Sequence, residues 1–315
     1  MAYQLSEILE RTRQDPAAFL AECDSVYQQR LETAADCIAG RLKDSPIVLL
    51  SGPSGSGKTT TAMKLEQALE RRGINSHTVS LDNYFKSMDH ATAPRTPEGD
   101  IDYESPLLLD MDLLDDTFTR LSRGEEIIVP KFEFARQMRN PVKGRPLQLG
   151  KNEIAIFEGI HALNDDIAGR HPEATGLYIS ARSDIVDGDT VVFKGTWMRI
   201  VRRAVRDLNF RGTDLVSTFE MWHNVRRGEK HYISPFKHRA SIILDSSLRY
   251  EVSVFANYAA PLAQAVEAVS PENPRCRELH TLVESFHRFA PIDPALVDKD
   301  ALIREFIGGG SYKYH

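Results

Sequence analysis

The sequence predicts an α/β fold of the P-loop NTPase type, with a central, mainly parallel sheet, helices on both faces and a helical lid. Residues 52–59 read GPSGSGKT, and they stand between an apolar run at 47–51 and a helix-forming stretch at 60–69. Further short apolar runs recur later in the chain, at 154–157, 176–179 and 241–244. Strands this short and uniformly apolar are typical of a parallel sheet that is covered on both faces.

The other elements follow from periodicity and from breaker residues. Residues 1–45 predict helices that precede the first strand, with a break at Asp15-Pro16, because proline disfavours a helical conformation in the residue before it. After the P-loop helix, the pattern predicts a strand, a loop, a helix and an extended stretch, at 76–81, 86–104, 106–123 and 126–134. Gly144-Arg145-Pro146 interrupts the next stretch, which indicates a hairpin there.

These elements divide the chain into three parts. We expect an N-terminal helical extension at 1–45, a P-loop domain at 46–270 that carries the lid at about 195–215, and a C-terminal helical extension at 271–315. The three glycines at 308–310 predict that this last extension ends in a flexible tail.

Composition narrows the class of protein. The chain has 315 residues and a net charge of -6, which argues against a surface that coats nucleic acid and against a polybasic membrane anchor. No apolar run is long enough to span a bilayer. The three cysteines are scattered, which suggests reduced thiols in a cytoplasmic protein, and the histidines show no zinc spacing. We therefore expect neither a nucleic-acid nor a membrane partner.

The glycine-rich octapeptide predicts a phosphate site. Glycines let backbone amides converge on phosphate oxygens, and the following helix N-terminus adds unpaired donors and partial positive charge. Lys58 is expected to reach the β- and γ-phosphates of ATP, and Thr59 to hold Mg²⁺ through its hydroxyl. A surface turn is the alternative, which the flanking strand and helix disfavour. The predicted nucleotide-binding residues are Gly52, Ser54, Gly55, Ser56, Gly57, Lys58, Thr59 and Thr60.

Two acidic residues follow predicted strands, and ligands gather at the carboxyl ends of strands in open α/β sheets. Asp82 follows the second strand, and we expect it to orient or deprotonate an acceptor hydroxyl. Glu158 follows the 154–157 strand and is the predicted carboxylate on the metal side. Each could instead be an ordinary cap or turn residue.

A helix at 197–211 carries an arginine-rich face. Its arginines recur with a spacing that places them together, at Arg199, Arg202, Arg203 and Arg206, with Arg211 just before Gly212. Guanidinium groups bind phosphate oxygens in a bidentate manner, so the face suits a lid that closes over the site. We expect catalytic roles for Arg202 and Arg206 beside Lys58, and a nucleotide contact for Arg199. The alternative is a solvated basic face.

Aromatic residues gather between the second strand and the hairpin, and they include Tyr84, Phe132 and Phe134. A flat base or sugar could stack on them, although core packing is an equal alternative for each. Asp102 lies among them and could accept hydrogen bonds from sugar hydroxyls, or could be a turn residue.

These pieces, in this order, resemble the uridine kinase/phosphoribulokinase family of P-loop kinases, and within it the uridine–cytidine kinases. The similarity covers residue 47 to about residue 260 and rests on GPSGSGKTT at 52–60, LDNYF at 81–85, IDYESP at 101–106, VPKFEFARQMR at 129–139, IFEGIHAL at 156–163 and RIVRRAVRDLNFRGTD at 199–214. The resemblance implies transfer of the γ-phosphoryl group of ATP to the 5′-hydroxyl of a nucleoside, with uridine and cytidine as the first candidates.

The resemblance also implies roles for individual residues. Asp82 matches the catalytic aspartate, Thr59 and Glu158 match the magnesium-side residues, and Asp102 matches the aspartate that binds ribose hydroxyls. The substrate-side positions that the motifs indicate are Asp82, Tyr84, Asp102, Phe132, Phe134, Gln137, Arg139 and Arg211. The chain departs from uridine–cytidine kinases where Gln137 replaces a histidine and Ile101 replaces a phenylalanine.

Two alternatives to a nucleoside kinase stay open. The acceptor could be a sugar phosphate or a pantothenate-like alcohol, since cations are available on the acceptor side at Arg136, Arg139, Lys143 and Arg145. The protein could also be a nucleotide-gated regulatory module that hydrolyses ATP slowly. Related kinases are often oligomeric, which leaves a homo-oligomer open as well.

Overall fold

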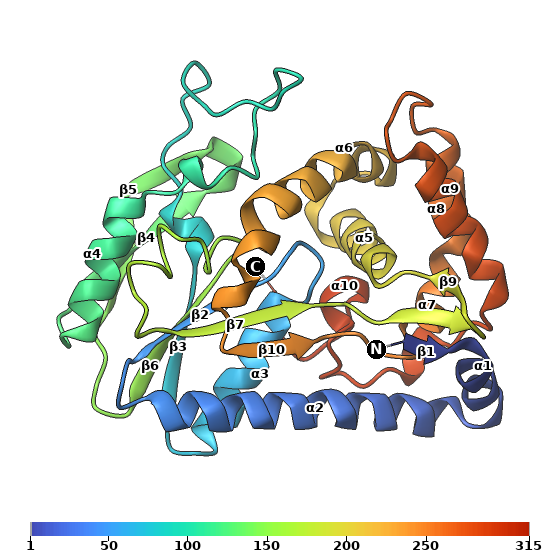
Figure 1. Ribbon diagram of the computed structural model, residues 1–315, viewed down its shortest axis with the longest axis horizontal. Helices are drawn as coiled ribbons and strands as arrows, with labels where there is room; N and C mark the ends of the chain where they lie inside the picture. The colour runs from blue at the N-terminus through green and yellow to red at the C-terminus, as the bar shows by residue number, and fades with distance from the viewer. Residues whose placement is uncertain (1, 315) are drawn as a thin grey trace.

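A five-stranded parallel sheet forms the centre of the computed structural model, which describes residues 2–314 (Figure 1). The strand order is β10-β7-β2-β6-β3, and every neighbouring pair is parallel. The strands are β2 (Ile47–Ser51), β3 (Asn75–Ser80), β6 (Glu153–Glu158), β7 (Thr175–Ser180) and β10 (Ile242–Asp245). The predicted α/β class is confirmed, and the five predicted strands all lie in this sheet.

Alternating side chains of the strands pack against two separate cores. Val48 and Leu50 of β2 face one core, whereas Ile47 and Leu49 face the other, because successive side chains in a strand point to opposite faces. The second core contains α4 (Met111–Ser122). The first core receives side chains from the remaining helices: α1 (Leu5–Gln14), α2 (Pro16–Arg41), α3 (Lys58–Glu70), α5 (Gly195–Arg206), α6 (Leu215–Gly228), α7 (Glu251–Phe255), α8 (Ala259–Glu267), α9 (Cys276–Ser285) and α10 (Arg304–Ile307).

The terminal segments contribute to the same core as the sheet. The predicted helix break is confirmed at Asp15, whose side chain accepts a hydrogen bond of 3.0 Å from the Ala18 amide and so caps α2. Leu31 of α2 and Leu302 near the other end of the chain are both fully buried in the core that contains Val48. The boundaries predicted at 45 and 270 therefore do not separate independent cores.

Two small sheets lie outside the main one. The antiparallel hairpin joins β4 (Ile127–Glu133) to β5 (Met138–Leu147), and its turn is at 134–137. Gly144 was predicted to mark the hairpin, but it lies inside β5, paired with Pro130. The second sheet was not predicted and contains β1 (Ala2–Gln4), β8 (Asp184–Asp187) and β9 (Thr190–Phe193). Strands of three or four residues carry too little periodicity to be recognised in the sequence.

None of the helices within residues 2–314 combines the length and the apolar character that crossing a membrane requires.

Candidate active site

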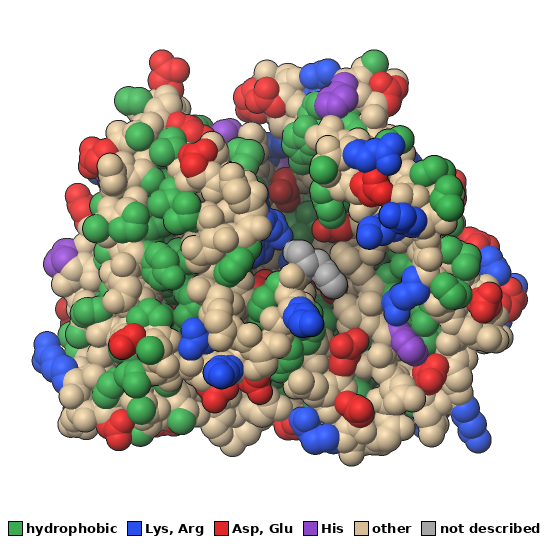
Figure 2. Space-filling model, turned by 180° about the vertical axis from the view of Figure 1, so that it is seen from behind, with side chains coloured by type: hydrophobic (Ala, Val, Ile, Leu, Met, Phe, Trp, Pro, Cys, Tyr) green, Lys and Arg blue, Asp and Glu red, His purple; other side chains and the backbone are tan. Residues whose placement is uncertain are grey.

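A cavity of about 1740 Å³ opens at the carboxyl ends of β2, β3 and β6. Figure 2 shows this side of the molecule hollowed between two raised parts, with Lys and Arg side chains nearby. The P-loop, Asp82 and Glu158 all line the cavity, which is where ligands are expected in an open parallel sheet. Drug-sized ligands occupy pockets of roughly 300–1,000 Å³, so this cavity has room for two small molecules side by side.

The P-loop leads into α3 through Gly57, whose φ of +85° is a left-handed conformation that glycine adopts without strain. Lys58 is the first residue of the helix, and its ammonium group donates to the carbonyls of Gly52, at 2.9 Å, and Pro53, at 3.3 Å. Burial lowers the pKa of Lys58, and the carboxylates of Glu158 and Glu305 are the largest opposing influences. The Lys58 side chain therefore lies against the P-loop carbonyls and close to the carboxylates of Glu158 and Glu305.

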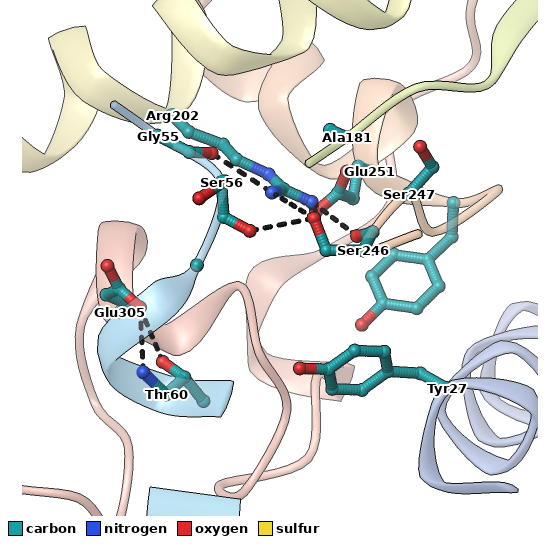
Figure 3. A network of polar contacts seen from close by, with 12 residues as sticks. Tyr27, Gly55, Ser56, Thr60, Ala181, Arg202, Ser246, Ser247, Glu251 and Glu305 are labelled. Carbon is teal, nitrogen blue, oxygen red and sulfur yellow. Dashed lines mark hydrogen bonds and ion pairs between the residues drawn. The ribbon is translucent and has the colours of Figure 1, made fainter. Parts of the chain in front are cut away.

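Arg202 braces the P-loop from behind and does not line the cavity (Figure 3). Its guanidinium donates to the carbonyl of Gly55 at 3.1 Å and pairs with the Glu251 carboxylate at 2.6 Å. Ser246 completes the network, since its hydroxyl donates to the Ser56 carbonyl at 2.7 Å. The predicted catalytic role of Arg202 is thus wrong for this structure: the side chain is fully buried, and its donors are engaged by the protein.

Arg199 is likewise structural. It pairs with Glu229 at 2.7 Å, donates to the Ser54 carbonyl at 3.3 Å and lies over the Trp222 ring. Its predicted nucleotide contact is therefore corrected to a contact with the P-loop backbone. Because Glu229 and Glu251 are 30 and 49 residues away from their partners, the spacing of the arginines could not reveal them.

The other arginines of this region do line the cavity, namely Arg203, Arg206 and Arg211. Arg203 donates to the Ser54 hydroxyl at 3.1 Å. All three surround the Asp207 carboxylate, at 3.2, 3.1 and 3.6 Å respectively. The arginine-rich helix therefore presents guanidinium groups to the cavity, as predicted, but Arg203, which was not singled out as a site residue, takes the place expected for Arg202.

Two carboxylates, Asp82 and Glu158, line the same cavity as Lys58 and interact with its charge. Burial raises the pKa of Asp82, while Lys58 and Arg211 oppose that shift. Burial also raises the pKa of Glu158 to about 7, although Lys58 lowers it. Oxygen ligands of this kind, with the Thr59 hydroxyl, suit Mg²⁺, which prefers to be held by one or two carboxylates plus phosphate oxygens. Within residues 2–314, no group of three or more His, Cys, Asp or Glu side chains is placed to hold a metal ion.

Glu104 is a third carboxylate of the cavity and was not predicted. Burial raises its pKa to about 7, and Arg203 and Lys58 lower it. A close approach of α6 holds it in place: a side-chain carbon on Gly228 would lie 2.3 Å from the Glu104 Cβ, so only glycine fits. Glu104 lies in the IDYESP motif at 101–106, but the sequence pattern favoured Asp102, two positions earlier, as the site residue.

Asp102, by contrast, is not among the residues that line the cavity. It is almost fully buried, and its two carboxylate oxygens are engaged by Arg227 at 3.0 Å and by the Tyr232 hydroxyl at 3.1 Å. The predicted contact with sugar hydroxyls is therefore corrected: Asp102 links its loop to the end of α6, through Arg227, and to the turn that follows, through Tyr232.

The hairpin supplies an aromatic wall. Phe132 and Phe134 both line the cavity, with ring centroids 5.2 Å apart in an edge-to-face arrangement. Three cationic residues of the hairpin line it too: Lys131, Lys143 and Arg145. The wall therefore combines flat apolar faces with positive charge.

Three predicted substrate contacts lie outside this wall. Tyr84 is fully buried and packs edge-to-face against Phe157 in the second core. Arg139 pairs with Asp110 at 3.0 Å and donates to the carbonyl of Tyr84. Gln137 forms the hairpin turn, with a φ of +50°, and its carbonyl accepts the amide of Met88. These three assignments are corrected to structural roles. A sequence pattern alone does not distinguish residues that line a pocket from residues that pack behind its wall.

The C-terminal segment forms the remaining wall, which the sequence did not predict. Its cavity-lining residues are Arg304, Glu305, Gly308, Gly309, Gly310, Tyr312 and Tyr314. The Tyr312 hydroxyl donates to Gln67 of α3 at 2.9 Å, so the segment expected to be a flexible tail packs against the P-loop helix.

The chain is similar in sequence to proteins of one known family. The model of the Phosphoribulokinase / Uridine kinase family matches residues 47–253. A uridine kinase of Schizosaccharomyces pombe is 31% identical over 174 residues, which cover 55% of this chain and 34% of that protein. A uridine kinase of Staphylococcus aureus (strain JH9) is 28% identical over 217 residues, which cover 68% of this chain and 93% of that protein.

Among solved structures, a possible uridine kinase from Bacillus stearothermophilus shares 17% identity, with a TM-score of 0.41 over 63% of this chain and 88% of that one. The family match includes the P-loop, Asp82, Glu104 and Glu158 and ends before the C-terminal wall.

Proposed function

This chain belongs to the phosphoribulokinase/uridine kinase family, and on that premise we propose that it is a kinase that transfers the γ-phosphoryl group of ATP to the 5′-hydroxyl of a nucleoside. Uridine and cytidine are the first candidate acceptors, in keeping with the names of its relatives. We assign it to the cytoplasm, in line with cysteines that are all free in the structure.

The continuity of the cavity is the observation that carries this proposal. The P-loop, Arg203 and Arg206 of α5, the aromatic residues of the hairpin and the three carboxylates Asp82, Glu104 and Glu158 all line this one cavity. Phosphoryl transfer depends mainly on positioning donor and acceptor in line and on stabilising charge, and a shared cavity of this size supplies the first requirement.

Each charged group then has a role that fits its position. Lys58, Arg203 and Arg206 would stabilise the negative charge of the transferring group. Mg²⁺, when bound, would neutralise phosphate charge, with Thr59 and Glu158 as its ligands. Asp82 would accept the proton of the acceptor hydroxyl, and Glu104 would accept hydrogen bonds from neighbouring hydroxyls.

The proposal is tested by an ATP-to-ADP assay with Mg²⁺ against nucleosides, sugar phosphates and pantothenate. Asp82→Asn should bind ATP normally but lower turnover at least about 10²-fold, the usual scale of general-base catalysis. Lys58→Ala should abolish turnover. Asp189→Asn is the matched control, because Asp189 is exposed in the turn between β8 and β9. Normal turnover in Asp82→Asn would remove that residue from its role.

A sugar phosphate is the second candidate acceptor, and the cationic side chains of the hairpin favour it. Lys131, Lys143 and Arg145 line the acceptor end of the cavity, where an uncharged nucleoside needs no cation. If a sugar phosphate is the true acceptor, it should give the highest kcat/KM of the panel, and Arg145→Met should raise its KM without raising that of ATP. Nucleoside-dependent turnover that is unaffected by Arg145→Met would exclude this alternative.

A further inference from the structure

The C-terminal wall places a carboxylate on the N-terminus of the P-loop helix. One oxygen of Glu305 accepts the amide of Thr60 at 3.2 Å and its hydroxyl at 2.6 Å (Figure 3). The two residues are 245 positions apart, and Glu305 is 6% exposed. The Tyr314 hydroxyl lies 3.2 Å from the same Thr60 hydroxyl.

These donors are ones that phosphate would otherwise use. The first amides of an α-helix have no acceptor within the helix, which is why a helix N-terminus binds anions. Thr60 is the third residue of α3, and Gly57, which precedes the helix, has no side chain to cap it. The Glu305 carboxylate therefore acts as the cap, and it brings a negative charge to the end of the cavity where the nucleotide phosphates are expected.

The backbone around Glu305 cannot easily withdraw. Leu302 and Phe306 are fully buried, Leu302 packs against Gly57, and the Arg202 guanidinium lies 5.3 Å from the Phe306 ring. Helix α10 is thus fastened to the P-loop and to α5. Only the Glu305 side chain is free to leave Thr60, by rotation about its own bonds.

We propose that Glu305 competes within the chain with a phosphate group of the nucleotide for Thr60, and that its carboxylate must leave Thr60 when nucleotide binds. The inference rests on the proposed function, because it requires the P-loop to bind a nucleoside triphosphate. Glu305 would then lower the affinity for nucleotide, although it lies outside residues 47–253, the stretch that the family model matches.

The test is calorimetric titration of the 315-residue chain with ADP and with a non-hydrolysable ATP analogue, each in Mg²⁺ and in EDTA. The variants are Glu305→Ala, Glu305→Gln and Lys58→Ala. Glu272→Gln is the control, because Glu272 is an exposed carboxylate of the C-terminal region. Glu305→Ala should lower the Kd about tenfold with and without Mg²⁺, the scale of one charge-assisted contact. Glu305→Gln, which removes only the charge, should lower it less.

Thermal melts separate competition from simple capping. A cap alone would make Glu305→Ala melt at a lower temperature with an unchanged Kd, and that result would overturn the proposal. Weaker binding confined to the Mg²⁺ arm would make Glu305 a metal-side residue and would also overturn it. If Glu305→Ala does not fold, Glu305→Gln decides by the same criteria.

Failure of the inference is distinguishable from failure of the proposed function. Binding that is lost in Lys58→Ala but unchanged in both Glu305 variants would overturn the inference alone. If neither the native chain nor Glu305→Ala binds nucleotide, or if Lys58→Ala binds as well as the native chain, both fail.

Discussion

At the scale of single residues, the site is organised by carboxylates whose protons are held unusually tightly. Burial raises the pKa of Glu104 and of Glu158 to about 7, and it raises the pKa of Asp82. A neutral carboxyl group binds Mg²⁺ poorly and does not take a proton from a hydroxyl. The free protein is therefore expected to be only partly in its active ionisation state at neutral pH.

This predicts that kcat/KM rises with pH between about 6 and 8. Below pH 7 the decline should be roughly tenfold per pH unit for each carboxylate that must ionise, and kcat/KM reports the free enzyme. Glu104→Gln should make the profile shallower and raise the KM of the acceptor, whereas the exposed Glu284→Gln should leave both unchanged. A flat profile between pH 6 and 8 would contradict these assignments.

The same raised pKa values have the opposite consequence for stability, because they favour the folded state at low pH. The folded pKa of Glu104 and Glu158 lies above the ordinary value of 4.5, so the folded state binds more protons than the unfolded state between about pH 4.5 and 7. The contribution of these two groups to the free energy of unfolding is therefore fully present below pH 4.5 and is lost as pH rises through 7. Activity and this part of the stability change in opposite directions.

At the scale of elements, α5 separates two kinds of arginine on one helix. Arg199 and Arg202 donate to P-loop carbonyls and pair with buried carboxylates, whereas Arg203 and Arg206 line the cavity. By holding carbonyl oxygens of Ser54 and Gly55 from behind, the first pair fixes the loop whose amides are expected to bind phosphate. The helix is thus both a support for the P-loop and a wall of the site.

Neighbouring residues of α5 should therefore respond differently to the same substitution. Arg202→Met should lower the free energy of unfolding by about 3–5 kcal/mol, because it leaves the buried Glu251 without a partner. Arg203→Met should cost less stability than Arg202→Met, because Asp207 keeps Arg206 and Arg211 as partners, but it should lower kcat. Chemical denaturation and steady-state kinetics of both variants check this. Equal losses of unfolding free energy in Arg202→Met and Arg203→Met would contradict the assignment of different roles to these two arginines.

At the scale of the whole molecule, the chain termini belong to the architecture that builds the site. Helix α2 packs in the same core as β2 and α3, and the Tyr27 hydroxyl lies 2.7 Å from the Thr61 hydroxyl at the base of the P-loop helix. The C-terminal segment closes the cavity from the opposite end of the sequence. The family match, at 47–253, thus covers the catalytic frame, while residues on both sides of it complete the core.

If the terminal helices are integral, a cavity in α2 should destabilise the entire domain. Leu31→Ala should lower the free energy of unfolding by roughly 2–5 kcal/mol in a single cooperative transition, since Leu31 is fully buried. Gln29→Ala, an exposed position on the same helix, is the control and should change little. Two separate transitions, with nucleotide binding retained after the first, would show that α2 is a detachable extension.

The sequence by itself determined the fold class, the five sheet strands, the P-loop and two carboxylates near strand ends, Asp82 just after β3 and Glu158 at the end of β6. Each of these depends on local information: apolar runs, glycine spacing and the rule that ligands gather where parallel strands end. The hairpin was predicted as well, but its turn was placed ten residues too late, because Gly144 tolerates a position inside a strand.

Only the tertiary structure decided which polar residues face the cavity and which are buried beneath it. Arg202, Asp102 and Tyr84 have the residue types and spacing of site residues, yet partners far along the chain bury them, whereas Glu104 and Glu305 enter the site through contacts with α6 and α3. A buried charge needs a partner, and that partner is selected by packing in three dimensions. Sequence spacing fixes the face of a helix on which a side chain lies; only the fold fixes what that face meets.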